Sequence, residues 1–123
     1  MSLNRIAAIL VSVAVVAISG CKDEPILDEA AVGLIEARKA IDEGDSAKAI
    51  ELLTASIESS PSPWSYYERA KLFAEDGDDE VAKEDIAAGL ELDPEHSDLL
   101  WLQKQMKKSK SSRFKQPPPS TSK

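Results

Sequence analysis

Cysteine and histidine are the side chains that most often act as nucleophiles, bases or metal ligands, and this 123-residue chain has one of each, Cys21 and His96. A zinc site or a cysteine–histidine nucleophile needs several such groups at characteristic spacings, and none is found here. His96 follows a Pro-Glu pair ahead of a helical pattern, so we expect a solvated loop histidine. No glycine-rich phosphate loop is present either. The sequence therefore predicts no enzyme, no metal site, no cofactor and no small-molecule substrate.

An acidic run from Asp76 to Glu80, with Gly77 inside it, offers the carboxylates that calcium prefers. An EF-hand loop needs glycine at its sixth position, and counting back from Gly77 would begin the loop at Leu72, which is no ligand. The run is better explained as a turn between helices, because acidic residues are favoured at the N-terminus of the following helix.

The residues before Cys21 predict a different chemistry, acylation of its thiol. Arg5 lies in a short polar start, Ile6 to Ile18 is a thirteen-residue apolar run broken only by Ser12, and Ser19-Gly20 directly precede the cysteine. A membrane-spanning helix needs about 20 apolar residues, so the run suits an export signal better than a stable span. Small residues before the cysteine let an extended backbone enter a peptidase. The pattern resembles the lipobox of bacterial lipoproteins.

This resemblance implies that residues 1–20 are a signal peptide and that the mature chain begins at Cys21 with a diacylglycerol thioether and an amide-linked third acyl chain. Several acyl chains anchor a protein far more firmly than one. Residues 21–25 would form the lipidated N-terminus and a short linker. Lys22 follows the cysteine, which in lipoproteins of the enterobacterial type favours the outer over the inner membrane. We expect a lipid-anchored protein of the cell envelope; the alternative is an ordinary cysteine after an uncleaved anchor.

The charge of the chain is divided into two blocks. Residues 22–106 contain all 22 acidic residues and eight basic ones, a formal charge of −14, whereas six basic residues follow from Lys107 onward. So acidic a body repels phosphate backbones, and the basic tail contains no recognisable base-reading module. We therefore expect no nucleic-acid partner.

Residues 26–108 predict a small all-α domain, because Ala, Leu, Glu, Lys and Asp dominate and aromatic or β-branched residues are few. Residues 36–61 and 69–94 are identical at eight of 26 positions at an offset of 33. The period and the spacing of small residues resemble the tetratricopeptide repeat, a helix-turn-helix unit of about 34 residues. The resemblance implies five helices in antiparallel hairpins: repeat 1 at about 30–62, repeat 2 at about 63–95 and a capping helix at about 97–108. An unrelated helical bundle is the alternative.

The same resemblance implies which residues pack the repeats. Small residues stand where two helices cross, larger apolar ones fill the space beside the crossing, glycine ends the first helix and proline ends the second. These positions are Ala37, Gly44, Ala49 and Pro61 in the first copy and Ala70, Phe73, Gly77, Ala82, Ile86 and Pro94 in the second. In the second copy alone, Arg69 is expected to pair with Asp85.

In tetratricopeptide proteins the first helices of successive repeats line a concave groove that binds a protein or peptide partner. Matching them here implies groove residues Leu34, Arg38, Ile41 and Asp42 beside Trp64, Tyr67, Lys71 and Glu75. Arg38 and Lys71 hold equivalent places and could bind a partner's acidic side chain or terminal carboxylate, with Trp64 and Tyr67 offering apolar contact. Alternatively, the two cations only balance neighbouring acids.

The last residues, 109–123, are rich in Ser, Lys and Pro with one aromatic, Phe114, so they predict a disordered tail. Taken together, the sequence predicts a membrane-anchored protein-interaction module of the bacterial envelope, by analogy an assembly or scaffold factor. The alternative is a structural envelope lipoprotein whose basic tail contacts the cell wall or anionic lipid.

Overall fold

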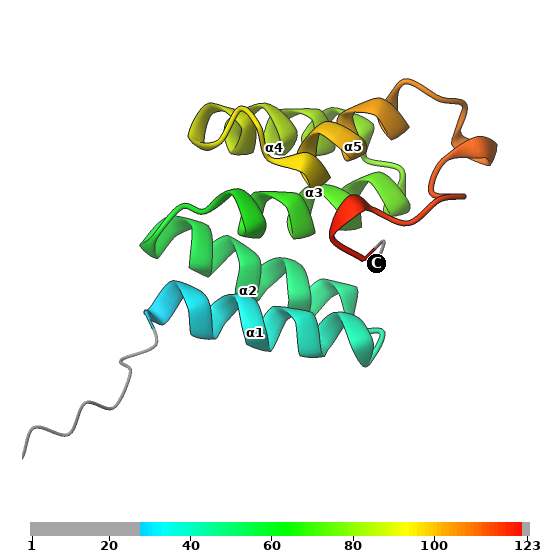
Figure 1. The fold of residues 1–123 in the computed structure, drawn as a ribbon. Coiled ribbons are helices and arrows are strands. Elements are labelled where there is room, and N and C mark those ends of the chain that lie inside the picture. Colours follow the sequence, from blue (N-terminus) through cyan, green and yellow to red (C-terminus); the bar gives the residue numbers. More distant parts are fainter. Residues whose placement is uncertain (1–27, 122–123) are drawn as a thin grey trace, which may run out of the picture.

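The computed structural model describes residues 28–121 of the chain, which fold into five α-helices and two short 3₁₀ turns without any strand (Figure 1). The α-helices are α1 (Glu29–Asp42), α2 (Ser46–Ser59), α3 (Pro63–Asp76), α4 (Asp79–Leu92) and α5 (Ser97–Met106), and the turns are η1 (Lys110–Ser112) and η2 (Pro119–Thr121). The predicted all-α class is confirmed. The predicted signal peptide, residues 1–20, and Cys21 lie outside the described residues. None of the helices described here is long and apolar enough to cross a membrane.

Side-chain caps begin α2 and α3 where the sequence changes from a turn to a helical pattern. Asp45 Oδ1 accepts a hydrogen bond from the Lys48 N–H at 3.0 Å, and Ser62 Oγ accepts one from the Ser65 N–H at 3.1 Å. Pro63 stands at the first turn of α3, where a missing N–H costs nothing.

Glycine and proline end the helices as the sequence predicts. Gly77 has a φ of 98°, a left-handed conformation that glycine adopts without strain, and it closes α3. Gly44 has a φ of 80° in the turn after α1. Pro61 and Pro94 hold the residues before them in extended conformations and so stop α2 and α4.

The helices form two antiparallel hairpins, α1–α2 and α3–α4, which stack in chain order with α5 against the second hairpin (Figure 1). Two cores hold them together. The core of the first hairpin and the neighbouring face of α3 contains Ala37, Ala40, Ala49, Leu53 and Leu72. The core of the second hairpin and α5 contains Tyr67, Ala70, Ala74, Ala82, Ile86, Leu99, Leu102 and Met106, with Phe73 packed against it. Ala70 and Ala82 are fully buried, so α3 and α4 meet closely at these residues.

Arg69 on α3 pairs with Asp85 on α4, which confirms the expected ion pair. Arg69 Nε and Nη2 donate to the two carboxylate oxygens of Asp85 at 2.8 and 2.7 Å. Arg69 Nη1 also donates to Thr54 Oγ1 on α2 at 3.0 Å. One guanidinium therefore fixes α3 against both its partner helix and the preceding hairpin.

His96 differs from the solvated loop histidine that its sequence position predicts. It is 7% exposed, and its Nδ1 accepts a hydrogen bond from the Leu99 N–H at 3.3 Å, so it caps α5. The imidazole is buried because it packs on the ring of Trp64, with 4.4 Å between centroids. The prediction was wrong because it considered the loop alone and not the aromatic face of α3 opposite it.

The described part of the tail, residues 109–121, also differs from the disorder that its composition predicts. After α5 the chain passes through η1, turns back and brings η2 into contact with α5 (Figure 1). Arg113 and Phe114, the charged and aromatic side chains of this segment, attach it to the helices. Two such side chains can fix a short segment that has no core of its own.

Candidate functional site

A cavity of about 460 Å³ opens between α1, α3 and the returning tail. It is lined by Leu34, Arg38, Trp64, Tyr67, Glu68, Lys71, Pro118, Ser120 and Thr121. Five of the eight residues that the sequence predicts for a groove are among them, so the matched positions of the two copies do face one another. We call this cavity the groove.

The other three predicted residues lie elsewhere. Ile41 packs against the core of the first hairpin, Asp42 is exposed at the last position of α1, and Glu75 borders a separate hollow beside Leu72. All three stand at the C-terminal ends of α1 and α3. The groove is therefore confined to the N-terminal and middle turns of these two helices.

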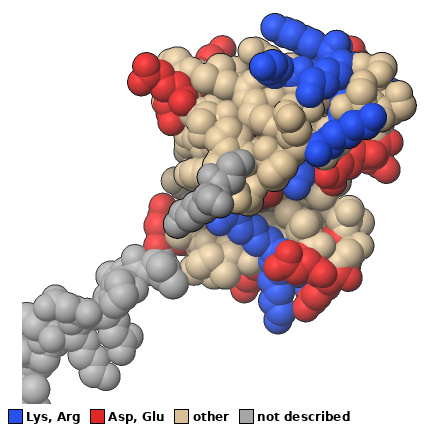
Figure 2. Space-filling model, turned by 45° about the vertical axis from the view of Figure 1, so that its right-hand side comes forward, with Lys and Arg blue, Asp and Glu red and all other residues tan. Residues whose placement is uncertain are grey.

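The two predicted cations of the groove have acidic partners within the chain. Arg38 Nε donates to Glu68 Oε1 at 2.9 Å, and its guanidinium lies 5.7 Å from the centre of the Trp64 ring. Lys71 Nζ lies 3.9 Å from Glu75 Oε1. Figure 2, turned toward the returning tail, shows acidic and basic side chains mixed on this face rather than one sign alone. The contacts favour the alternative that Arg38 and Lys71 balance neighbouring acids.

Sequence reasoning missed Glu68, although a signal for it exists. Trp64, Tyr67, Glu68 and Lys71 are spaced as one face of a helix, and all four line the groove. Glu68 could have been found by extending the α3 face instead of matching the two copies position by position.

Aromatic rings form one wall of the groove. Trp64 meets Tyr67 edge-on at 6.4 Å between centroids, and His96 closes the group behind them. Burial, and after it the nearby carboxylate of Asp98, raises the pKa of the Tyr67 hydroxyl well above its usual range, so this group stays protonated. Trp64 remains 39% exposed. This wall offers an accessible aromatic surface next to ion-paired charges.

The far side of the groove is formed by the tail, which is anchored on Asp98. Asp98 lies in the first turn of α5 and is fully buried. Its Oδ1 accepts the backbone N–H of Ser120 at 3.1 Å, and its Oδ2 accepts the Ser120 hydroxyl. No sequence pattern links these two residues, because their contact depends on the path by which the tail returns.

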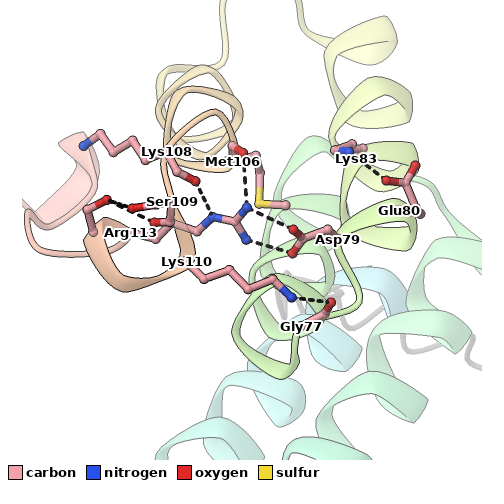
Figure 3. Close-up of polar contacts among 10 residues, drawn as sticks. Gly77, Asp79, Glu80, Lys83, Met106, Lys108, Ser109, Lys110 and Arg113 are labelled. Carbon is pink, nitrogen blue, oxygen red and sulfur yellow. Dashed lines mark hydrogen bonds and ion pairs between the residues drawn. The ribbon is translucent and has the colours of Figure 1, made fainter.

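A second attachment holds the tail at the other end of α5 (Figure 3). Arg113 donates from Nη1 and Nη2 to the two carboxylate oxygens of Asp79 at 2.8 and 2.9 Å, and also donates to the Met106 and Lys108 carbonyls at 3.2 Å each. These hydrogen bonds from Arg113 hold the pKa of Asp79 below its usual range. Next to Arg113, the ring of Phe114 packs near that of Trp101, with 6.1 Å between the ring centroids. The tail thus has a charged and an aromatic attachment before it reaches the groove.

These side chains offer surfaces for binding: the exposed face of Trp64, paired charges, and the buried carboxylate of Asp98, which accepts an N–H and a hydroxyl. Within residues 28–121, no group of three or more His, Cys, Asp or Glu side chains is arranged to hold a metal ion. No family model, curated protein or solved structure matches this chain.

Proposed function

We propose that the chain is a lipid-anchored protein-interaction module of the bacterial envelope, built on the plan of the tetratricopeptide repeat, whose groove holds a short segment of a partner protein. The observation that carries this proposal is that a short segment of polypeptide, Pro118 to Thr121, forms one side of the groove and is held there by hydrogen bonds to Asp98. A surface that accepts one short peptide segment has the shape and the hydrogen-bond acceptors to accept another.

The order of the helices supports the relation to tetratricopeptide proteins. The four helices of the two hairpins are 14 residues long, and the first helix of each hairpin contributes to the groove. α5 buries Leu99 and Leu102 against the second hairpin, as a capping helix would. A role in assembly or as a scaffold follows by analogy with larger proteins of this plan.

The alternative, a structural lipoprotein whose basic tail contacts cell wall or anionic lipid, has less support from the contacts of the tail. Arg113 donates hydrogen bonds to Asp79 of the same chain, and Lys110 Nζ donates to the Gly77 carbonyl at 3.4 Å. Lys107 and Lys115 are exposed and remain available to an outside anion.

Mass spectrometry of the mature protein tests the anchor. We expect residues 1–20 to be absent and Cys21 to carry acyl chains, because the apolar run before it is short for a stable span and small residues precede the thiol. Cys21→Ala, which keeps the small side chain, should abolish acylation and leave the precursor uncleaved. A chain that still begins near Met1 and has a free thiol would contradict the lipoprotein proposal.

Site-specific photo-crosslinking in the native envelope tests the groove. A photoreactive amino acid at Trp64 or Lys71 is expected to form adducts with one defined partner protein, because both side chains line the groove. The matched control is Lys83 on α4, an exposed lysine outside the groove. If all three positions give the same adducts, or if none gives any, the groove is not the partner site.

A further inference from the structure

One side of the groove is formed by the chain itself. The segment from Arg113 to Thr121, which we call the strap, leaves its attachment on Asp79 and ends in η2, which contacts α5 and lines the groove together with Trp64 and Lys71. Within η2, the Thr121 N–H and hydroxyl both bond to the Pro118 carbonyl, at 3.1 and 3.0 Å. The part that meets the groove is therefore a compact proline-led turn.

Asp98 is the group that binds this turn through hydrogen bonds. A buried carboxylate is costly unless hydrogen-bond donors satisfy it, and Ser120 supplies one donor to each carboxylate oxygen. The Ser97 hydroxyl adds a longer contact of 3.4 Å to Oδ1. Because both of the shorter bonds come from the backbone and side chain of one residue, any serine or threonine whose N–H is free to donate carries both groups that Asp98 accepts here.

Pro118 suits the same site for a different reason. Pro118 lines the groove that contains Trp64 and Tyr67, and a proline ring packs well on an aromatic face. Prolines also restrict the free peptide, so less conformational entropy is lost when it binds.

The strap is attached unevenly. Arg113 is held by four hydrogen bonds and Phe114 packs on the core of the second hairpin, whereas Lys115, Gln116 and Pro117 are exposed. Phe114 has a φ of 59°, a left-handed conformation that is strained for a bulky residue. At the far end Ser120 and Thr121 lie at the surface although Asp98 beneath them is buried. The end in the groove can therefore leave while the Arg113 attachment stays in place.

We propose that the partner segment is a proline-led turn ending in serine or threonine, that its serine or threonine replaces Ser120 on Asp98, and that the strap competes for the groove within the same molecule. This inference rests on the proposed function and names the chemistry of the partner. Ser120 is tethered seven residues after Arg113. A segment tethered over so short a distance has an effective concentration in the millimolar range, so it weakens the binding of a free peptide of similar intrinsic affinity.

The test measures the affinity of a labelled, end-capped peptide, Lys-Gln-Pro-Pro-Pro-Ser-Thr, for the full lipidated chain in detergent micelles, by fluorescence anisotropy. Ser120→Pro removes both donors from the strap and should strengthen peptide binding by about tenfold or more. The matched control, Gln116→Pro, puts a proline into the exposed part of the strap, keeps Ser120, and should bind the peptide as the natural chain does.

A second peptide with alanine in place of serine isolates the contact with Asp98. It should bind the Ser120→Pro chain about tenfold more weakly or worse, because it lacks the hydroxyl that Asp98 accepts. Asp98→Asn introduced into the Ser120→Pro chain should weaken binding of the serine peptide in the same way. Circular dichroism shows whether this variant keeps its helices; if it does not, the alanine peptide alone decides the role of Asp98.

Each contrary outcome is separable from the proposed function. Equal peptide affinity for the natural and Ser120→Pro chains would overturn competition by the strap while leaving the groove a binding site. Equal affinity of the serine and alanine peptides would overturn the role of Asp98. If the serine peptide does not bind the Ser120→Pro chain up to about 1 mM, the proposed partner chemistry is overturned. The crosslinking experiment at Trp64 and Lys71 would still show whether the groove binds a protein.

Discussion

Replacing Ala82 by leucine is expected to lower the melting temperature of the helical domain by at least about 5 °C, whereas the same change at Ala87 should leave it nearly unchanged. Ala82 is fully buried in the core between α3 and α4, and Ala87, little more than one turn further along α4, is exposed. Overpacking a tight crossing costs about 1–3 kcal/mol, and each kcal/mol shifts the midpoint by about 4–8 °C in a domain of this size.

Thermal unfolding of a soluble form that begins after Cys21 measures the difference. The comparison is well controlled because both changes add the same side chain to the same helix and have the same effect on helix propensity. If both sites tolerate leucine equally, α4 does not need a small residue at its crossing with α3, and the repeat register is wrong.

Removing the carboxylate of Asp85 is expected to be the other large loss, about 1.5–3 kcal/mol of unfolding free energy. Asp85→Ala leaves the Arg69 guanidinium, whose side chain is 18% exposed, with Thr54 as its remaining side-chain hydrogen-bond partner within the described residues. In the natural chain the hydrogen bonds that Arg69 donates to Asp85 raise the pKa of Arg69. Without Asp85 the guanidinium still keeps its proton, because arginine stays charged in proteins, so it cannot escape this cost by becoming neutral. Denaturant unfolding gives the free energy directly.

Two further variants separate this effect from the loss of any surface charge. Glu84→Ala removes an exposed carboxylate from the neighbouring position on α4 and should change stability by no more than about 0.5 kcal/mol. The double variant Arg69→Met with Asp85→Leu removes the charge together with its partner and should be more stable than Asp85→Ala alone. A single variant no less stable than the double would mean that Arg69 finds another partner.

The helices and their limits were predictable because their signals are local. Ser62, Gly77 and Pro94 each act on the backbone within a few residues, so the sequence gives the start of α3, the end of α3 and the end of α4 without knowledge of the fold. The pair between Arg69 and Asp85 was predictable only through the resemblance to a repeat, which supplies the register of two helices.

Contacts between distant segments were not predictable in the same way. From the sequence alone, Gly89 is an unfavourable residue inside α4. In the structure an added Cβ would lie 2.6 Å from Leu99 Cδ1 and 3.1 Å from Tyr66 Cβ. Any larger residue at this position would therefore force its neighbours to move. The contact between Ser120 and Asp98 likewise requires knowledge of how the tail turns after α5. Composition describes the average behaviour of residues 109–123, and two well-placed side chains, Arg113 and Phe114, were enough to depart from it.

The two hairpins differ in how firmly they are held, and this determines where the domain opens first. Three of the five residues in the core that the first hairpin shares with α3 are alanines, and Val32 and Ile35 on α1 are exposed, so α1 buries little apolar surface. The junction between the first and second hairpins includes a polar contact between Ser56 on α2 and Ser65 on α3. Such a contact contributes less to stability than the burial of apolar side chains. Local unfolding should therefore begin at α1, the helix that follows the proposed lipid anchor in the sequence. Tension on that anchor would reach the weakest element first and would separate the α1 wall of the groove from the α3 wall while α3, α4 and α5 remain folded.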